Sequence, residues 1–210
     1  RTPGSVRGAS GNRRPYRDEG WEYMATKLKR DGARTQRIAE ELAESLPKPE
    51  YSVLFDHGDS SRSDVCQPTS YMGRRYGADA TLSGIDIAVV HRGKLIILVE
   101  IEESAARPKT ILGDIFGVAV ADRVRIQNRA YPIDGVTMIV SLTVEEKGKR
   151  AVKYLRLERQ VSKYLAEHDG ASGNPRVGKV RVITSNAEDL VRRTERLVRL
   201  EAHKAAKTSS

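Results

Sequence analysis

Three carboxylates stand inside an otherwise apolar stretch that runs from Gly84 to Glu102. Asp86 lies in the first of two apolar runs, and Glu100 and Glu102 lie near the end of the second. Side chains alternate between the two faces of a strand, so Glu100 and Glu102 are expected to leave the same face. A tight turn between the runs would return the chain so that Asp86 lies beside them. Carboxylates that converge in this way repel one another unless a cation lies between them, so the pattern predicts a metal site.

An ordinary surface hairpin is the alternative interpretation. In that case Glu102 marks the solvated end of the strand, and Asp86 lies at an edge, paired with Arg92 or Lys94. Against this, the run from Leu95 to Val99 is continuously apolar, which is typical of a strand covered on both faces. A carboxylate beside such a strand is expected to be paired or to bind a metal.

The elements that must position these acids follow from hydrophobic periodicity and from turn residues. We expect helices and strands of an α/β domain, in the order helix 18–46, strand 51–55, polar loop 56–80, the two strands of the hairpin, helix 110–127, strand 136–142, helix 149–167, strand 179–184 and helix 186–206. Three regions follow from this order: a flexible basic arm at 1–16, a core at 17–145, and a basic helix–strand–helix extension at 146–210 that packs on the same domain.

The net charge of +9 is unevenly distributed along the 210 residues. Residues 1–34 carry nine Lys and Arg against four Asp and Glu, residues 35–144 carry twelve against fifteen, and residues 145–210 carry sixteen against nine. An acidic middle between two basic flanks favours a polyanion that is held by the flanks and processed at the centre. The alternative is a basic protein whose helices have solvated charged faces.

Cysteine content and hydropathy narrow the class of protein. Cys66 is the single cysteine, which excludes an internal disulfide and a thiolate metal cluster. No run of apolar residues is long enough for a membrane span, and the N-terminal residues lack the apolar core of a secretion signal. We therefore expect an intracellular, cytoplasmic protein that makes no membrane contact.

The element order resembles that of a known nuclease superfamily. Over residues 18–145, the order helix, strand, strand, strand, helix, strand, with an acid on the second strand and Glu-x-Glu at the end of the third, is similar to the PD-(D/E)xK or restriction-endonuclease-like core. This resemblance implies a mixed central sheet flanked by helices (αβββαβ). It also implies that Asp86, Glu100 and the backbone carbonyl of Ile101 hold Mg²⁺, for which Mn²⁺ can substitute.

Two positions depart from the family pattern. Ile85 stands where the family has proline, and Glu102 stands where it has lysine. Some type II restriction endonucleases resemble this sequence in carrying Glu-x-Glu, and there the second acid is expected to hold or deprotonate the attacking water. Lys109, at the start of the next helix, is preferred to Lys94 as an alternative source of the missing ammonium group; the other interpretation is that both are surface lysines.

Many family members also use a glutamate from the first helix. Glu41 or Glu44 is the counterpart here, and Glu41 shares a helical face with Ile38, which would let it point inward. The alternative is that both are solvated helix acids. Histidine offers no competing cluster, although the turn sequence Asp56-His57-Gly58-Asp59 is locally compatible with metal binding.

Candidate nucleic-acid contacts are arginines in three places. Arg74 and Arg75 lie between Tyr71 and Tyr76 in the polar loop region, where they are expected to contact a sugar-phosphate backbone or to stack on bases. The other candidates are Arg13 and Arg14 in the basic arm, and Arg192, Arg193, Arg196 and Arg199 on the last helix. An ordinary surface turn and a solvated helix face are the alternatives.

The leading prediction is a magnesium-dependent endodeoxyribonuclease that hydrolyses duplex DNA, of the type II restriction class. We expect a homodimer, because two symmetric sites suit the cutting of both strands. The alternatives are a nucleic-acid-binding protein whose nuclease-like core is inactive, with Glu102 as the mark of that loss, and a nuclease specific for junctions, damaged duplex or RNA.

Overall fold

The computed structural model describes residues 32–102, 107–144, 149–168 and 176–208. Their elements, in chain order, are α2 (Ala33–Ser45), β1 (Tyr51–Phe55), β2 (Thr69–Tyr71), β3 (Thr81–Gly84), β4 (Ile87–His91), β5 (Lys94–Glu102), α3 (Pro108–Ala119), β6 (Arg123–Ile126), β7 (Arg129–Pro132), β8 (Val136–Thr143), α4 (Lys149–His168), β9 (Val177–Ser185) and α5 (Leu190–Thr208). The predicted basic arm, with Arg13 and Arg14, lies outside the described residues.

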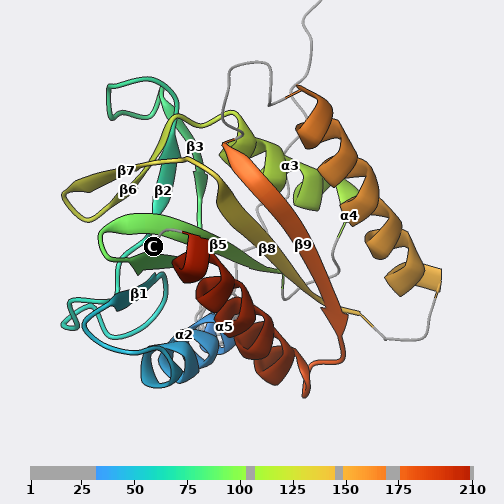
Figure 1. Cartoon of the computed structure of the whole chain (residues 1–210), viewed down its shortest axis with the longest axis horizontal. Coiled ribbons are helices and arrows are strands. Elements are labelled where there is room, and N and C mark those ends of the chain that lie inside the picture. The colour runs from blue at the N-terminus through green and yellow to red at the C-terminus, as the bar shows by residue number, and fades with distance from the viewer. Residues whose placement is uncertain (1–31, 103–106, 145–148, 169–175, 209–210) are drawn as a thin grey trace, which may run out of the picture. The chain divides into compact units, whose positions relative to one another are not determined.

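A mixed five-stranded sheet forms the centre of the fold, in the order β1-β4-β5-β8-β9 (Figure 1). The first three strands are antiparallel neighbours, whereas β8 runs parallel to β5 and β9 runs parallel to β8. The crossover from β5 to β8 includes α3, as a parallel connection requires. The predicted α/β class, with a mixed sheet flanked by helices, is confirmed.

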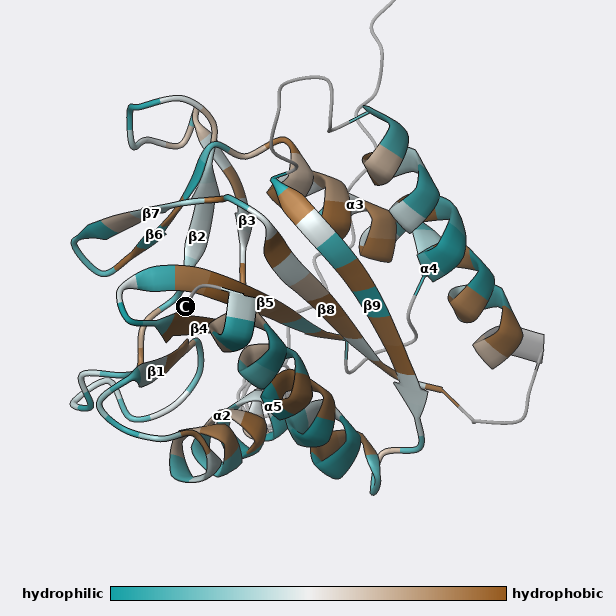
Figure 2. Cartoon of the chain, in the orientation of Figure 1, coloured by the Kyte–Doolittle hydropathy of each residue, from teal (hydrophilic) through white to brown (hydrophobic). Residues whose placement is uncertain are grey.

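The two faces of this sheet are covered by different helices. Alternate residues of β4 and β5 enter different apolar clusters: Ala88 and Leu98 pack with residues of α3 and α4, whereas Ile87 and Val99 pack with residues of α2 and α5. Figure 2 shows the resulting brown colour along the central strands. The α3–α4 face and the α2–α5 face are therefore separate environments, and a side chain's position in the strand decides which of them it enters.

A second, four-stranded antiparallel sheet, in the order β3-β2-β6-β7, was not predicted. The predicted helix 110–127 is wrong beyond Ala119, because β6 begins at Arg123. Val120 and Val124 fit helical spacing, but Val124 and Ile126 also alternate with arginines, and pairing with β2 selects the strand. The polar region 56–80 likewise contains a strand, β2, whose three residues are too few for a periodic signal.

The C-terminal segment adds an edge strand and a helix to the central sheet. β9 pairs with β8 along its length, and the hydroxyl groups of Ser141 on β8 and Thr194 on α5 share a buried hydrogen bond of 2.9 Å. A turn precedes α5, in which Asn186 Oδ1 accepts the Asp189 N–H, and α5 begins at Leu190, four residues after the start of the predicted helix 186–206. None of the described helices is both long and apolar enough to cross a bilayer.

Candidate functional site

The β4–β5 pairing brings the two predicted metal ligands together. Ile87 is opposite Val99 in the antiparallel register, so one further step places Asp86 opposite Glu100. Directly opposed residues of antiparallel strands share a face, with Cβ atoms about 5 Å apart. Both carboxylates follow the alternation of Ala88 and Leu98, which places them on the α3–α4 face.

Two hydrogen bonds fix Asp86 at this position. Its Oδ2 accepts the backbone N–H of Ile101 at 2.7 Å, and its carbonyl accepts the N–H of Asp56 at 2.8 Å. The alternative that Asp86 pairs with Arg92 or Lys94 at a surface edge is wrong. Arg92 contacts Glu50 at 2.7 Å and Lys94 contacts Asp134 at 3.3 Å, both around the turn end of the hairpin.

Glu100 has an enclosed carboxylate oxygen without a partner. Although the residue as a whole is only half-buried, its Oε1 atom is shielded from solvent and accepts no hydrogen bond. Burial, reinforced by the charges of Asp86 and Asp114, raises the pKa of Glu100 well above its ordinary value. Burial also raises the pKa of Asp86, despite the opposing effects of the Ile101 N–H and His57. The protein thus holds two adjacent carboxyl groups that resist ionising together.

Asp114, on α3, belongs to the same cluster and was missed by the sequence analysis. Burial, followed by the negative charges of Glu102 and Asp86, raises its pKa to about 6. A signal for it exists in the sequence: Asp114 is three residues after Ile111 and four before Val118, both buried on the inner face of α3. An acid within the apolar stripe of a helix is unusual unless it serves a site. We name Asp86, Glu100, Glu102 and Asp114 the acid cluster.

The donor set of the acid cluster fits a hard divalent cation. Asp86 and Glu100 offer carboxylate oxygens, which Mg²⁺ prefers, and the unpartnered Oε1 of Glu100 is an acceptor that a cation would satisfy. Within a strand, the N–H and C=O of one residue point to the same edge. The Ile101 carbonyl therefore shares the edge at which its N–H meets Asp86. Among the described residues, no three His, Cys, Asp or Glu side chains already stand in metal-ligating geometry, so the fit is that of two carboxylates and a carbonyl.

Glu41 and Glu44 are not brought to the acid cluster. Glu41 forms an ion pair of 3.0 Å with Arg37 on α2, and Glu44 is exposed. The buried residues of α2, such as Ile38, pack on the face of the sheet opposite the acid cluster. The expectation that Glu41 points inward with Ile38 is therefore wrong, because the apolar stripe of this helix is centred on Ile38 and Leu42.

No lysine takes the place of the family lysine in the described part of the chain. Lys109 is exposed on the first turn of α3, and no hydrogen bond or ion pair joins it to Asp86, Glu100 or Asp114. Lys94 lies at the far end of β5 from Glu102, eight residues away, which is about 26 Å along a strand. The expectation that Lys94 could reach the site is therefore wrong.

The turn sequence Asp56-His57-Gly58-Asp59 divides between two roles. Asp56 and His57 lie close enough to influence the pKa of Asp86, the first raising it and the second lowering it. The Asp56 carboxylate accepts hydrogen bonds from the His57 N–H and from Gln67, whereas Asp59 accepts the N–H of Ser61 in its own turn. Asp56 and His57 therefore flank the acid cluster, and the described residues of this turn form no metal-ligating group of their own.

The candidate nucleic-acid contacts occupy different surfaces. Arg192 pairs with Asp189 at 2.7 Å and Arg199 with Glu195 at 3.4 Å, while Arg193 and Arg196 are exposed. All four are on α5, which covers the face of the central sheet opposite the acid cluster. Arg74 and Arg75 are exposed on the connection between β2 and β3, and β3 leads into Asp86.

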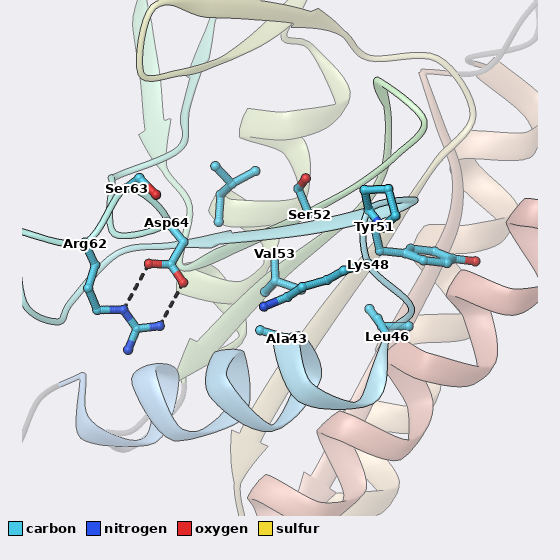
Figure 3. Close-up of a pocket in the computed structure, with 11 residues that line it drawn as sticks. Ala43, Leu46, Lys48, Tyr51, Ser52, Val53, Arg62, Ser63 and Asp64 are labelled. Carbon is cyan, nitrogen blue, oxygen red and sulfur yellow. Dashed lines mark hydrogen bonds and ion pairs between the residues drawn. The ribbon is translucent and has the colours of Figure 1, made fainter.

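A cavity of about 560 Å³ lies elsewhere, along the outer edge of β1 (Figure 3). Residues of β1, of the end of α2 and of the loop around Arg62 line it. Figure 3 shows Asp64 held by Arg62 through two hydrogen bonds, with Lys48 extending along the cavity. None of the four residues of the acid cluster lines this cavity, so its volume does not bear on the chemistry of that cluster.

Comparison with known proteins identifies no family for the chain. No protein-family model matches it, and neither a curated protein nor a solved structure was found to be similar. The functional interpretation therefore depends on the residues of this chain alone.

Proposed function

We propose that this protein is a magnesium-dependent endonuclease that hydrolyses phosphodiester bonds in duplex DNA, with a core of the PD-(D/E)xK type. One observation carries the proposal: Asp86 and Glu100 face each other across two strands, and one oxygen of Glu100 is enclosed without a partner. A fold that keeps such a pair of acids at a cost in stability is expected to use them.

The topology supports the same proposal. α2, the antiparallel strands β1, β4 and β5, the crossover helix α3 and the parallel strand β8 follow the order αβββαβ. The second sheet is inserted between these elements, with β2 and β3 before β4 and with β6 and β7 after α3. The acids lie at the carboxyl end of β5, next to the helix that makes the crossover.

Different residues of the acid cluster are assigned to metal binding and to proton transfer. When bound, Mg²⁺ neutralises the charge of the phosphate and acidifies a water molecule. Asp86, Glu100 and the Ile101 carbonyl would hold it, and the Ile101 N–H fixes the orientation of Asp86. Glu102, two residues along the same face, is positioned to accept the proton of the attacking water.

A cleavage assay with matched variants tests the assignment. Circular duplex DNA is incubated with the protein and Mg²⁺, with and without chelator, alongside Asp86→Ala and Glu100→Ala. We expect chelator to stop cleavage and each variant to lose about 10²–10³-fold or more in rate. Asp134→Ala, which removes an ion-paired acid at the other end of the hairpin, is the control and is expected to cut as the wild type does.

Further outcomes separate this proposal from its alternatives. Undiminished cleavage by Asp86→Ala or Glu100→Ala would contradict the site assignment. Binding of DNA without cleavage of any tested substrate would instead favour a nucleic-acid-binding protein with an inactive core, in which Glu102 in place of the family lysine marks the loss of activity. Glu102→Gln is expected to lower the rate about 10²-fold if Glu102 is the base.

Product pattern and mass test the finer parts of the proposal. Discrete fragments from a long duplex indicate a type II restriction enzyme, a smear indicates a less specific nuclease, and preference for branched or damaged DNA or for RNA indicates a structure-specific one. Two symmetric active sites suit the cutting of both strands, so we expect the active species to have the mass of a homodimer.

A further inference from the structure

The outer face of the second sheet carries cations and aromatic rings on neighbouring strands. On this face Arg123 is directly opposite Tyr71, and Arg125 is directly opposite Thr69. The alternate residues of β6, Val124 and Ile126, are buried in the core, so both arginines are on the solvent side. We name this surface the basic face and define it by Arg74, Arg75, Arg123 and Arg125 with Tyr71 and Tyr76.

The arginines of the basic face lack acidic partners. Within the described part of the chain, none of Arg74, Arg75, Arg123 and Arg125 forms an ion pair, and the Nε of Arg123 is enclosed without a hydrogen-bond partner. Arginines elsewhere on the molecule do pair with acids, including Arg37, Arg62, Arg92, Arg176, Arg181, Arg192 and Arg199. Four unneutralised guanidinium groups on one surface favour a polyanionic ligand.

Aromatic contacts hold part of this surface in place. The guanidinium of Arg125 lies 4.8 Å from the centre of the Tyr76 ring, and its Nε donates to the carbonyl of Gln127 at 3.0 Å. Tyr76 in turn meets Tyr71 edge to face, with ring centres 5.1 Å apart, and remains 42% exposed. Rings interleaved with arginines can contact sugars and bases, whereas an acidic peptide would need only the charges.

The basic face adjoins the acid cluster along the chain. β3 ends at Gly84, and two residues later the chain reaches Asp86, a separation of at most about 7 Å between Cα atoms. The link is fixed by a hydrogen bond of 2.8 Å from the Ile85 N–H to the Pro68 carbonyl, beside β2. A strand of nucleic acid with one phosphate at the acid cluster would therefore have its next phosphates within reach of the second sheet. Figure 2 shows hydrophilic residues at the tip of the β6–β7 hairpin, which belongs to that sheet.

We propose that the basic face binds the sugar-phosphate backbone of the nucleic acid on one side of the scissile bond. Arg123 and Arg125 contact successive phosphates, and the exposed Arg74 and Arg75 extend this grip along the same strand. The assignment of a scissile bond rests on the proposed nuclease function, but binding by the basic face does not require the reaction. The second sheet is thus a substrate-holding insertion rather than only a cover for the core.

A salt titration of binding tests this assignment. The affinity for a short fluorescently labelled duplex is measured by anisotropy in the presence of chelator, so that no cleavage occurs. For Arg123→Gln with Arg125→Gln we expect about tenfold weaker binding and a slope of log K against log salt that is smaller by about 2, since each phosphate contact contributes about 0.9. The control is Arg37→Gln with Arg92→Gln, which removes the same charge from ion pairs on α2 and at the β4–β5 turn and is expected to change the slope little.

Additional variants make each outcome decisive. Arg74→Gln with Arg75→Gln removes two exposed side chains and provides a second measurement if the β6 variant unfolds, which melting curves will show; its slope is also expected to fall by about 2. An unchanged slope in a folded variant, or equal losses in the control, would overturn the proposal. Asp86→Ala is expected to retain binding. If the basic-face variants bind DNA less well but the wild type cuts no substrate, binding by the basic face is supported and the nuclease function is contradicted. If the wild type cuts DNA but the salt slope of the variants is unchanged, the nuclease function is supported and binding by the basic face is contradicted.

Discussion

Two enclosed carboxylates in this molecule have opposite surroundings. Glu201 on α5 is 4% exposed and lies among cations: Lys179 Nζ is 2.7 Å from Oε2, Lys204 Nζ is 3.5 Å from Oε1, and Arg181 Nε is 3.8 Å from Oε1. Glu100 on β5 lies among acids, and its Oε1 has no partner. The same chain therefore neutralises one buried acid fully and leaves the other uncompensated.

The different surroundings of Glu201 and Glu100 shift the pKa values of the two carboxyl groups in opposite directions. Burial raises the pKa of Glu201, but the hydrogen bond and the charge of Lys179, with Lys204 and Arg181, lower it overall. Burial and neighbouring acids raise the pKa of Glu100. The first arrangement stabilises the fold, because it favours the charged form that prevails at neutral pH. The second costs stability there, which is expected of a site that awaits a cation.

The largest stability effect is expected where the charges are compensated. Glu201→Gln removes the negative charge and leaves Lys179 and its neighbours without their partner, so we expect a loss of about 2 kcal/mol, or about 4–8 °C in melting temperature. Thermal unfolding measured by circular dichroism at neutral pH checks this. Glu167→Gln, which breaks an exposed pair with Lys163 on α4, is the control and is expected to change stability by less than about 0.5 kcal/mol. Equal effects of the two substitutions would mean that the Glu201 network contributes nothing beyond a surface pair.

The acid cluster should respond to a divalent cation where Glu201 does not. At ten times the Kd, Mg²⁺ is expected to stabilise the wild type by about 1.4 kcal/mol relative to a solution of equal ionic strength without it. Glu100→Gln and Asp86→Asn should lose this gain, whereas Glu201→Gln should retain it despite its lower starting stability. Thermal unfolding with and without Mg²⁺ measures both. A gain that persists in Glu100→Gln would place the cation elsewhere.

The contrast between these regions was only partly accessible from sequence. Asp86 and Glu100 were predicted together because the strand period and the short hairpin fix their relation locally. The central strands were predicted because their apolar runs are long. Asp114 was missed because its distance from the hairpin depends on how α3 packs across the sheet, although its place between Ile111 and Val118 was a usable signal. Lys204 is a local partner of Glu201 on the same helix, but Lys179 and Arg181 come from β9, twenty or more residues earlier, and no local pattern links them to Glu201.

The second sheet was missed for a different physical reason. β2 and β3 have three and four residues, and the pairing of β2 with β6 is a contact between distant parts of the chain. Val120 and Val124 fit both a helix and, with Ile126, a strand, and tertiary pairing decided between them. Short strands held by distant partners thus lie beyond what periodicity detects, and so does the basic face that they create.

A smaller effect is expected from relieving the like charges. Asp114→Asn removes one negative charge beside Glu102 and Asp86, so the protein without metal should gain about 1 kcal/mol at neutral pH, or about 2–4 °C. Differential scanning calorimetry with chelator present checks this against Asp134→Asn, whose carboxylate pairs with Lys94 and whose loss is expected to be neutral or slightly destabilising. If Asp114→Asn is no more stable than the wild type, Asp114 does not interact with the other carboxylates of the acid cluster.

The pH dependence of these two variants should fall in different ranges. The pKa of Asp114 is raised from 3.8 to about 6 in the folded protein, so its stability contribution is complete below 3.8 and is lost as pH rises through about 6. The advantage of Asp114→Asn over the wild type should therefore appear as pH rises across that range.

Glu201 has a lowered pKa, so its contribution is present above 4.5 and is lost as pH falls through its folded pKa. The deficit of Glu201→Gln should accordingly persist from neutral pH down to about 4.5 and shrink only below it. Melting temperatures across this pH series, with chelator throughout, measure the difference of each variant from the wild type. If both differences changed with pH in the same way, the surroundings of Asp114 and Glu201 would not differ in charge as proposed.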